Sequence, residues 1–160
     1  YTGKVWVLGD DIDTDIIIPT EYLALKTIED MKQYGFSPLR PELAGQIQPG
    51  DIIVAGKNFG CGSSREQAPE VIKALGIPCI IAKSFARIFY RNALNNGLLL
   101  LEQPELHDVV KEGDTVTVTV NEDVDYNGKK YPIASLPENL MEIIEAGGLV
   151  KAMRRRNGLD

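Results

Sequence analysis

The chain has 160 residues, 44% of them hydrophobic and 25% charged, with a formal net charge of −6 and a pI near 4.9. Residues 1–160 are therefore expected to form one ordinary soluble domain with a sizeable core. The acidic balance argues against nucleic acid or an anionic membrane as a partner. No apolar run approaches the roughly twenty residues that cross a bilayer, and the first residues carry no secretory signal pattern, so we expect a cytoplasmic protein.

The N-terminal part is expected to begin with a strand over Lys4–Leu8 that ends at Gly9. An acidic stretch follows, with aspartates at positions 10, 11, 13 and 15. Their spacing is not that of an EF-hand loop, and short acidic stretches commonly make helix caps and turns, so turn chemistry is favoured over a metal site. A short helix to Tyr34 and a connection rich in proline and glycine complete this part.

The most informative stretch is Gly56–Gly76. It follows an apolar run, Asp51–Ala55, that predicts a buried strand, and its first glycines let the backbone turn sharply and approach a ligand. Two overlapping capping boxes, Ser63-x-x-Glu66 and Ser64-x-x-Gln67, predict a helix with Ser64 as its N-cap. Pro69 would then be the fifth helical residue and would remove a hydrogen bond, so a start nearer Pro69 is the alternative.

The start of this helix is suited to an anion. Unpaired backbone N–H groups, the helix dipole and the Arg65 guanidinium all favour negative charge there. The anion is either a substrate carboxylate or phosphate, or Ser63 itself as an alkoxide, whose hydroxyl is free if Ser64 is the cap. The plainer alternative, and the commoner one for such capping boxes alone, is that the serines only cap the helix.

The two cysteines do not indicate a disulfide framework. Cys79 falls in a predicted buried strand, Cys79–Ala82, and is expected to be a small core residue. Cys61 lies in the glycine loop, where a helix N-terminus can lower a thiol pKa, so it is kept as an oxidation-sensitive residue ranked below the serine as a nucleophile. With His107 as the single histidine, the chain cannot build a self-contained iron–sulfur or zinc site of the usual kind.

The second half predicts further helices and strands. Ser84 is expected to cap a helix to about Leu94, on which Arg87 and Arg91 lie one turn apart and are interpreted as a solvated or salt-bridged face. The remaining expected elements are a C-cap at Asn95–Gly97, strands over Leu98–Leu101 and Thr115–Val120, a hairpin at Asn127-Gly128, a helix over Pro137–Ala146 capped by Gly147-Gly148, and a basic tail, Arg154–Arg156. This order of elements indicates α/β architecture.

Four motifs in chain order carry a resemblance to a known family. They are Asp10–Pro19 with Tyr22-Leu23, Gly60-Cys-Gly-Ser-Ser-Arg-Glu66, Ala82–Phe89 followed by Asn95-Asn-Gly-Leu98, and Glu145-Ala-Gly-Gly-Leu149. Together they resemble the swivelling C-terminal domain of aconitases, most closely its free-standing form, the small subunit of the family's isomerases. The resemblance spans nearly the whole chain and implies a three-layer β/β/α swivelling domain.

The resemblance also implies a dehydratase that moves a hydroxyl between neighbouring carbons of a small hydroxy-dicarboxylic acid. In the family a [4Fe-4S] cluster on a separate large subunit acts as Lewis acid on the departing hydroxyl. Carried over residue by residue, Ser63 is the base that takes the proton alpha to a carboxylate, and Ser64 and Arg65 bind that carboxylate. Asp15 falls where the family keeps an active-site aspartate that orients either the serine or a neighbouring cation, and the adjacent Thr14 is expected to support the site. No cofactor or metal is expected on this chain itself, and a homo-oligomer of the isolated chain stays open.

The segment Tyr22–Lys26 follows the family's opening motif, where a mobile loop reaches the unreactive part of the substrate. Relatives that take a further carboxylate have an arginine there, whereas Leu23, Ala24 and Leu25 are apolar. Burying an isopropyl group would contribute about 2.4 kcal/mol, at about 0.8 per carbon, and an unpaired carboxylate would be penalised, so isopropylmalate is the preferred substrate.

Three alternatives stay open at this stage. The leucines at positions 23 and 25 can simply pack against the core. Lys26 can turn inward to accept homocitrate-type acids, which would give a homoaconitase or a dual-specificity enzyme. A stand-alone anion-binding regulatory module is the more distant alternative. Against it, Gly60-Cys-Gly-Ser-Ser fits neither the phosphate-loop pattern nor the dinucleotide fingerprint.

Overall fold

The computed structural model describes residues 1–62, 65–148 and 153. Its elements in chain order are β1 (Thr2–Val7), α1 (Thr14–Ile17), the 3₁₀ helix η1 (Thr20–Tyr22), α2 (Ile28–Lys32), α3 (Leu43–Gln46), β2 (Ile52–Ala55), α4 (Gln67–Ala74), β3 (Cys79–Ala82), α5 (Arg87–Asn95), β4 (Leu99–Glu102), α6 (Leu106–Val109), β5 (Thr115–Thr119), β6 (Asp123–Tyr126), β7 (Lys129–Pro132) and α7 (Glu138–Ala146).

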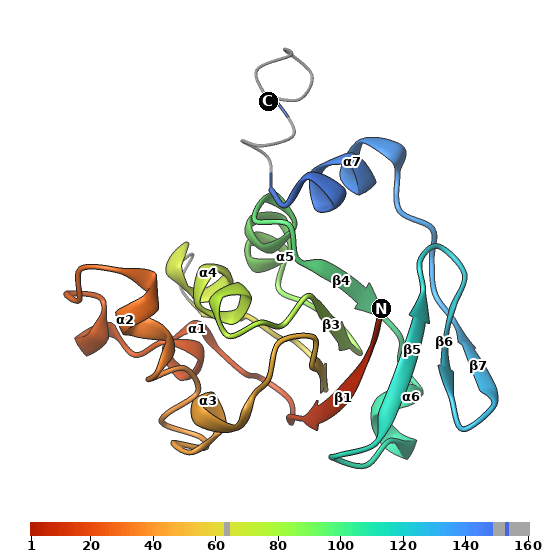
Figure 1. Ribbon diagram of the computed structural model, residues 1–160, viewed down its shortest axis with the longest axis horizontal. Coiled ribbons are helices and arrows are strands. Elements are labelled where there is room, and N and C mark those ends of the chain that lie inside the picture. Colours follow the sequence, from red (N-terminus) through yellow and green to blue (C-terminus); the bar gives the residue numbers. More distant parts are fainter. Residues whose placement is uncertain (63–64, 149–152, 154–160) are drawn as a thin grey trace.

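The strands form one seven-stranded sheet in the order β4-β3-β2-β1-β5-β6-β7 (Figure 1). Strands β1 to β4 are parallel, and β5 to β7 join them as an antiparallel meander. The change of direction occurs along β1, which pairs with β5 through Thr2–Lys4 and with β2 through Val5–Val7. This single strand therefore joins the two halves of the sheet.

Alternating side chains of the parallel strands build two separate cores. On β2, Ile53 and Ala55 face the helices together with Phe36 and Val71, whereas Ile52 and Val54 face the other way. The second core also contains apolar side chains of the antiparallel half, namely Val116, Val118, Val124, Tyr126 and Tyr131. Because strand side chains point to opposite faces in turn, the sheet must curl so that its antiparallel half covers one face of its parallel half.

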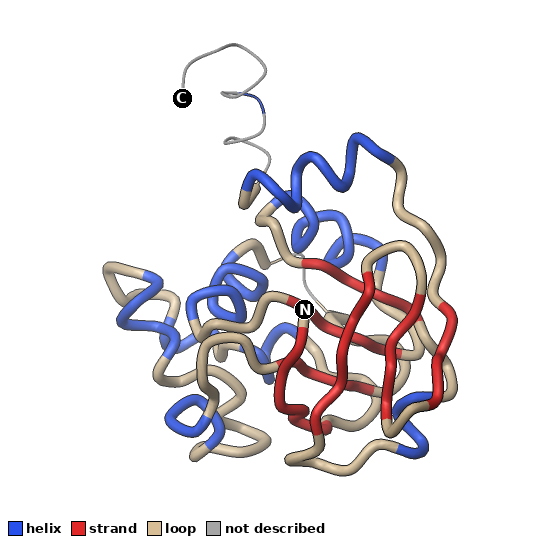
Figure 2. Tube along the Cα trace, turned by 45° about the vertical axis from the view of Figure 1, so that its right-hand side comes forward, coloured by secondary structure: helices blue, strands red, loops and turns tan. Residues whose placement is uncertain are grey.

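The resulting layers are antiparallel strands, parallel strands and helices, with α1 to α4 on the side away from β5 to β7 (Figures 1 and 2). This confirms the predicted α/β class and the three-layer β/β/α arrangement. No helix in the described part of the chain has the length and apolar character needed to cross a membrane.

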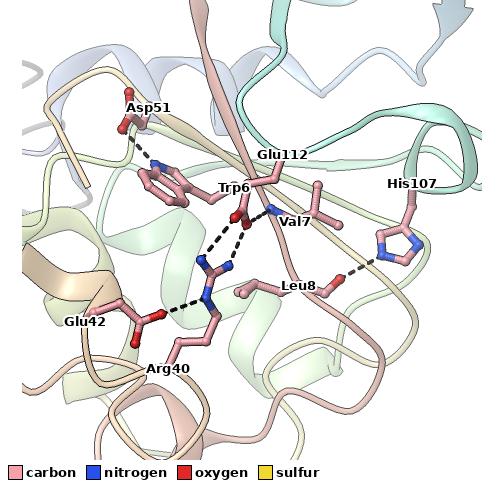
Figure 3. Close-up of polar contacts among 8 residues, drawn as sticks. All are labelled: Trp6, Val7, Leu8, Arg40, Glu42, Asp51, His107 and Glu112. Atoms are coloured by element: carbon pink, nitrogen blue, oxygen red, sulfur yellow. Dashed lines mark hydrogen bonds and ion pairs between the residues drawn. The ribbon is translucent and has the colours of Figure 1, made fainter. Parts of the chain in front are cut away.

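Polar contacts fix β1 at the point where it changes partners (Figure 3). The pairing of β1 with β5 ends before Val7. The Val7 N–H instead donates to the Glu112 carboxylate at 3.2 Å, so this side chain accepts the hydrogen bond that a neighbouring strand would otherwise accept. Arg40 grips the same carboxylate with two hydrogen bonds, at 2.5 and 3.0 Å. The indole Nε1 of Trp6 donates to buried Asp51 at 2.8 Å, so both buried polar groups are satisfied.

Most predicted elements are confirmed, including the hairpin, where Asn127 and Gly128 have φ of 54° and 81°. Two predicted caps are wrong. Helix α5 begins at Arg87 with Ala86 as its N-cap residue, because the Ser84 hydroxyl accepts a hydrogen bond from the Asn58 N–H at 2.8 Å instead.

The predicted N-cap of the central helix is the second error. Helix α4 begins at Gln67 with Glu66 at the N-cap position, rather than after Ser64. Pro69 is then its third residue, where the missing N–H has no partner in the helix anyway, so the alternative start nearer Pro69 is the right one. The basic tail predicted at Arg154–Arg156 lies outside the described residues.

Because the parallel strands are buried on both faces, replacing an isoleucine of β2 should destabilise the fold far more than replacing an exposed isoleucine. Ile53→Ala, at a fully buried position in β2, should lower the free energy of unfolding by about 2–5 kcal/mol because it leaves a cavity in the helix-covered core. The matched control is Ile88→Ala, at a position 58% exposed in α5, which should change it by less than about 0.5 kcal/mol. Urea denaturation measures both, and equal losses would contradict this placement of the core.

Candidate active site at the carboxyl ends of the parallel strands

The loops that follow β1, β2 and β3 meet at one edge of the sheet, where parallel strands end and ligands commonly bind. The Gly60 N–H donates to the Ile12 carbonyl at 2.7 Å, which joins the β1 loop to the β2 loop. The Phe59 N–H donates to the Ser84 carbonyl at 3.1 Å, and the Phe59 carbonyl accepts from the Ala86 N–H at 3.0 Å. Three segments far apart in the sequence are thereby fixed to one another.

Packing beneath these loops explains the glycine at position 60. The Phe59 ring is fully buried, and its centroid lies 5.3 Å from that of Phe89 and 6.1 Å from that of Phe85, in edge-to-face contacts. Gly60 has φ of 85°, and a Cβ there would collide with the Phe89 ring. Only glycine allows the loop to lie this close to α5.

The acidic stretch serves these loops. Asp10 accepts from the Lys57 N–H at 2.7 Å, Asp11 accepts from the Asn58 side chain at 3.1 Å, and Asp13 caps α1 through the Ile16 N–H at 2.9 Å. This confirms the interpretation of the stretch as turn and capping chemistry. Among the described residues, no group of three or more histidine, cysteine or acidic side chains is arranged to hold a metal ion.

Arg65 and Asp15 are brought together at this edge of the sheet. The Arg65 Nη1 donates to Asp15 at 2.6 Å and to the Ile18 carbonyl at 2.9 Å, and its Nη2 donates to Thr20 at 3.1 Å. The side chain of Arg65 is only 13% exposed, against 67% for Asp15. The hydrogen bond and then the charge of the guanidinium hold the pKa of Asp15 below its ordinary value, with the Thr20 hydroxyl adding to the effect.

A cavity of about 560 Å³ opens beside this ion pair. Its described lining comes from all three loops and the first turns of α5, and consists of Thr14, Gly60, Gly62, Arg65, Ala86, Arg87, Ile88, Phe89, Arg91 and Asn92. Three arginines and no carboxylate are among these residues, although the whole chain carries a net charge of −6. The cavity is therefore a local positive site that suits an anionic ligand.

Ser63 and Ser64, the predicted base and carboxylate ligand, lie outside the described residues. The residues on either side of them, Gly62 and Arg65, both line the cavity, as does the predicted supporting residue Thr14. Thr14 is buried, and its N–H donates to the Cys61 carbonyl at 2.9 Å. The described neighbours of the serines thus border one concave surface.

The three apolar residues of the predicted specificity loop are not among the described residues that line this cavity. Leu23 and Leu25 are partly buried and pack against the helix-covered core, whereas Ala24 and Lys26 are exposed. The alternative that these leucines pack against the core therefore describes this conformation, and Ala24 is the member of the trio that faces solvent.

Neither cysteine is arranged as a nucleophile. Cys79 is fully buried in β3, as predicted, and burial raises its pKa to about 12. The pKa of Cys61 is also raised, first by burial and then by the charges of Asp13 and Asp11. The prediction ranked a Cys61 nucleophile below the serine, and a raised thiol pKa disfavours that role further. His107 is partly buried, and its Nε2 donates to the Leu8 carbonyl at 2.7 Å.

Sequence reasoning missed the contribution of α5 to the site. Arg87 and Arg91 are exposed, as a solvated face requires, but they also border the cavity that contains Arg65. Their position in the sequence could have indicated this contribution, because α5 follows the parallel strand β3, and ligands bind at the edge of a sheet where parallel strands end. Their convergence with Arg65 depends on the three-loop packing, which sequence spacing does not show.

The fold and the site define a domain of the aconitase class. A family model described as aconitase C-terminal domain matches residues 20–106, more than half of the chain. A crystal structure of a 3-isopropylmalate dehydratase from Methanocaldococcus jannaschii superposes with a TM-score of 0.92 at 40% identity, covering 99% of this chain and 95% of that one.

Curated relatives narrow the class. The 3-isopropylmalate dehydratase small subunit of Lachnospira eligens is 79% identical over 100% of this chain and 98% of its own length. The isopropylmalate/citramalate isomerase small subunit of M. jannaschii is 46% identical over 96% of this chain and 94% of its own length. The chain therefore belongs to the aconitase C-terminal domain family and, within it, to the group of 3-isopropylmalate dehydratase small subunits.

The ion pair predicts a titration that NMR can follow. The pKa of Asp15 should lie below its ordinary value of 3.8, and Arg65→Gln should raise it toward that value. Because the folded-state pKa is the lower one, the pair stabilises the fold above the unfolded pKa and loses that contribution as the pH falls through the folded one. The matched control is Arg40→Gln, which removes the partner of Glu112 and should leave Asp15 unchanged. An Asp15 pKa that is the same in the wild type and in Arg65→Gln would contradict the contact between the two side chains.

Proposed function

We propose that this chain is the small subunit of a 3-isopropylmalate dehydratase, which interconverts 2-isopropylmalate and 3-isopropylmalate by dehydration and rehydration in leucine biosynthesis. The Lachnospira eligens relative, 98% of whose length is matched, carries the name 3-isopropylmalate dehydratase small subunit. The observation that carries the proposal is the cavity at the carboxyl ends of the parallel strands, because three arginines without a described carboxylate suit a doubly charged hydroxy acid.

Within this proposal, Ser63 takes the proton alpha to a carboxylate, and Ser64 and Arg65 bind that carboxylate. An unassisted serine hydroxyl is too weak an acid to be the base, so its alkoxide needs nearby positive charge and donors. The cationic lining of the cavity, with Arg65 within two residues of Ser63, supports such an environment. Asp15 is a positioning residue, because its carboxylate holds the Arg65 guanidinium against α1 and η1.

The reaction needs a Lewis acid, and we propose that it lies on a separate large subunit as a [4Fe-4S] cluster. Such a cluster would supply Lewis-acid chemistry for the departure of the hydroxyl. Among the described residues, Cys79 is enclosed in β3, and no group of three or more histidine, cysteine or acidic side chains is arranged to hold a metal ion. The chain supplies the base and the carboxylate-binding residues and is one half of an active site.

Reconstitution tests the function directly. Isopropylmalate isomerisation should be absent from the chain alone and from the cluster-loaded large subunit alone, and present in their mixture. Activity of either component by itself would contradict a shared site. Tight binding of inorganic phosphate by the chain alone, without isomerase activity in the mixture, would instead favour the stand-alone anion-binding module.

Removal of the proposed base should nearly abolish turnover. Ser63→Ala should lower kcat of the reconstituted enzyme by at least about 10²-fold, in the range expected for loss of a general base. The fold should be preserved, because α4 begins at Gln67 with Glu66 as its N-cap residue, and the substitution lies before both. Ser135→Ala, at an exposed serine beside the β6–β7 hairpin, is the control and should keep the wild-type rate. Retention of most of the rate in Ser63→Ala would remove Ser63 from the mechanism.

Substrate choice is proposed to depend on the loop that contains Ala24. The wild-type enzyme should prefer isopropylmalate to homoaconitate, since the loop offers no arginine for a further carboxylate. Ala24 is exposed, so Ala24→Arg can be accommodated and should shift the ratio of the two kcat/KM values toward homoaconitate by at least about tenfold, roughly 1.4 kcal/mol. The control is Ala134→Arg, at an exposed alanine after β7. An unchanged ratio in Ala24→Arg would sink the loop assignment and leave the serine assignment standing.

A further inference from the structure

Helix α5 has a buried face and an outward face of unusual composition. Its inner residues, Phe89, Ala93 and Leu94, are at most 3% exposed. Outward lie Arg87 and Arg91, both exposed, with Ile88 beside them at 58% exposure. We call these three residues the α5 ridge. An isoleucine this exposed between two cations differs from an ordinary solvated helix face, which is polar throughout.

The cations of the α5 ridge are not held in an ion pair within the described structure, although the Glu102 carboxylate lines a hollow together with them. Elsewhere the described arginines are matched: Arg40 pairs with Glu112 and Arg65 with Asp15. No ion pair joins Arg87 or Arg91 to a described carboxylate. Two like charges one turn apart destabilise a helix, so carboxylates from another molecule would relieve a repulsion that this chain carries alone.

The α5 ridge separates two hollows. On one side lies the cavity of about 560 Å³, and on the other a hollow of about 270 Å³ lined by Phe85, Arg87, Tyr90, Arg91 and Glu102. Arg87 and Arg91 belong to both linings. A small dicarboxylic acid can fill only one of these hollows and gains nothing from an exposed isoleucine. A protein surface laid across the ridge contacts both sides and buries the isoleucine.

We propose that the α5 ridge is the docking surface for the large subunit, whose matching surface carries carboxylates around an apolar contact. This inference rests on the proposed function, because it assumes the shared site. Since the ridge also borders the cavity, a partner seated on it covers the cavity mouth and shields the bound anion from water. Complementary charge at such a boundary mainly sets the rate and register of association.

The test is the affinity between this chain and the cluster-loaded large subunit, measured without oxygen. The double variant R87E/R91E should raise Kd at least tenfold and flatten its dependence on salt, because charge reversal turns attraction into repulsion. A matched double reversal, K129E/K130E on the exposed strand β7, should change Kd less than twofold. Ile88→Ala should raise Kd several-fold, whereas Val109→Ala, at another exposed aliphatic residue, should not.

Two further readouts separate the possible failures. Far-UV circular dichroism should show that every variant is folded, as expected for exposed positions. If the arginine variant binds the large subunit normally, the docking assignment is overturned whatever its KM for isopropylmalate, because both arginines also border the substrate cavity. If wild-type chain does not bind the large subunit at all, the proposed function fails together with the docking surface.

Discussion

The position of Phe59 is the constraint on which the site depends. Its ring is enclosed by the helix-covered core, and its main chain bonds in both directions to the segment that leads into α5. These contacts extend the pairing of β2 and β3 beyond the strands themselves. They draw the following glycine against Phe89, and only in that arrangement do the guanidinium groups of the β2 loop and of α5 border the same cavity.

Electrostatic asymmetry follows from this geometry. The chain is acidic overall, and its aspartates beside the site are occupied with backbone N–H groups and with Arg65. These aspartates hold the loops at the rim in place, and the described lining of the cavity contains arginines but no carboxylate. A cationic cavity on a chain of net negative charge guides small anions toward it. Asp15 helps to fix the orientation of the Arg65 side chain, because the guanidinium is bound by a carboxylate, a carbonyl and a hydroxyl.

The sequence predicts those features whose cause is local. The alternation of polar and apolar residues predicts β5, and continuous apolar runs predict β2 and β3. The Asn127-Gly128 pair predicts the hairpin turn, and all of these features are found. Caps were predicted less well, because a hydroxyl can serve a neighbouring loop, as that of Ser84 does. The curl of the sheet, the packing of Leu23 and Leu25 and the convergence of three arginines depend on contacts between distant segments, which no local pattern encodes. The roles of Ser63 and Ser64 come from family resemblance and stay predictions.

The shared use of β1 has a consequence for how the molecule is made. This strand is synthesised before the other strands of the sheet, and Val5 pairs with Ile52 whereas Thr2 pairs with Thr117, so its two pairings are completed at very different times. On a ribosome, one edge of β1 stays open until most of the chain has emerged. Contacts of such long sequence separation close slowly, and an open strand edge is prone to pair with other chains. The late arrival of β5 therefore makes the unfinished protein most vulnerable to aggregation in the interval before the sheet can curl.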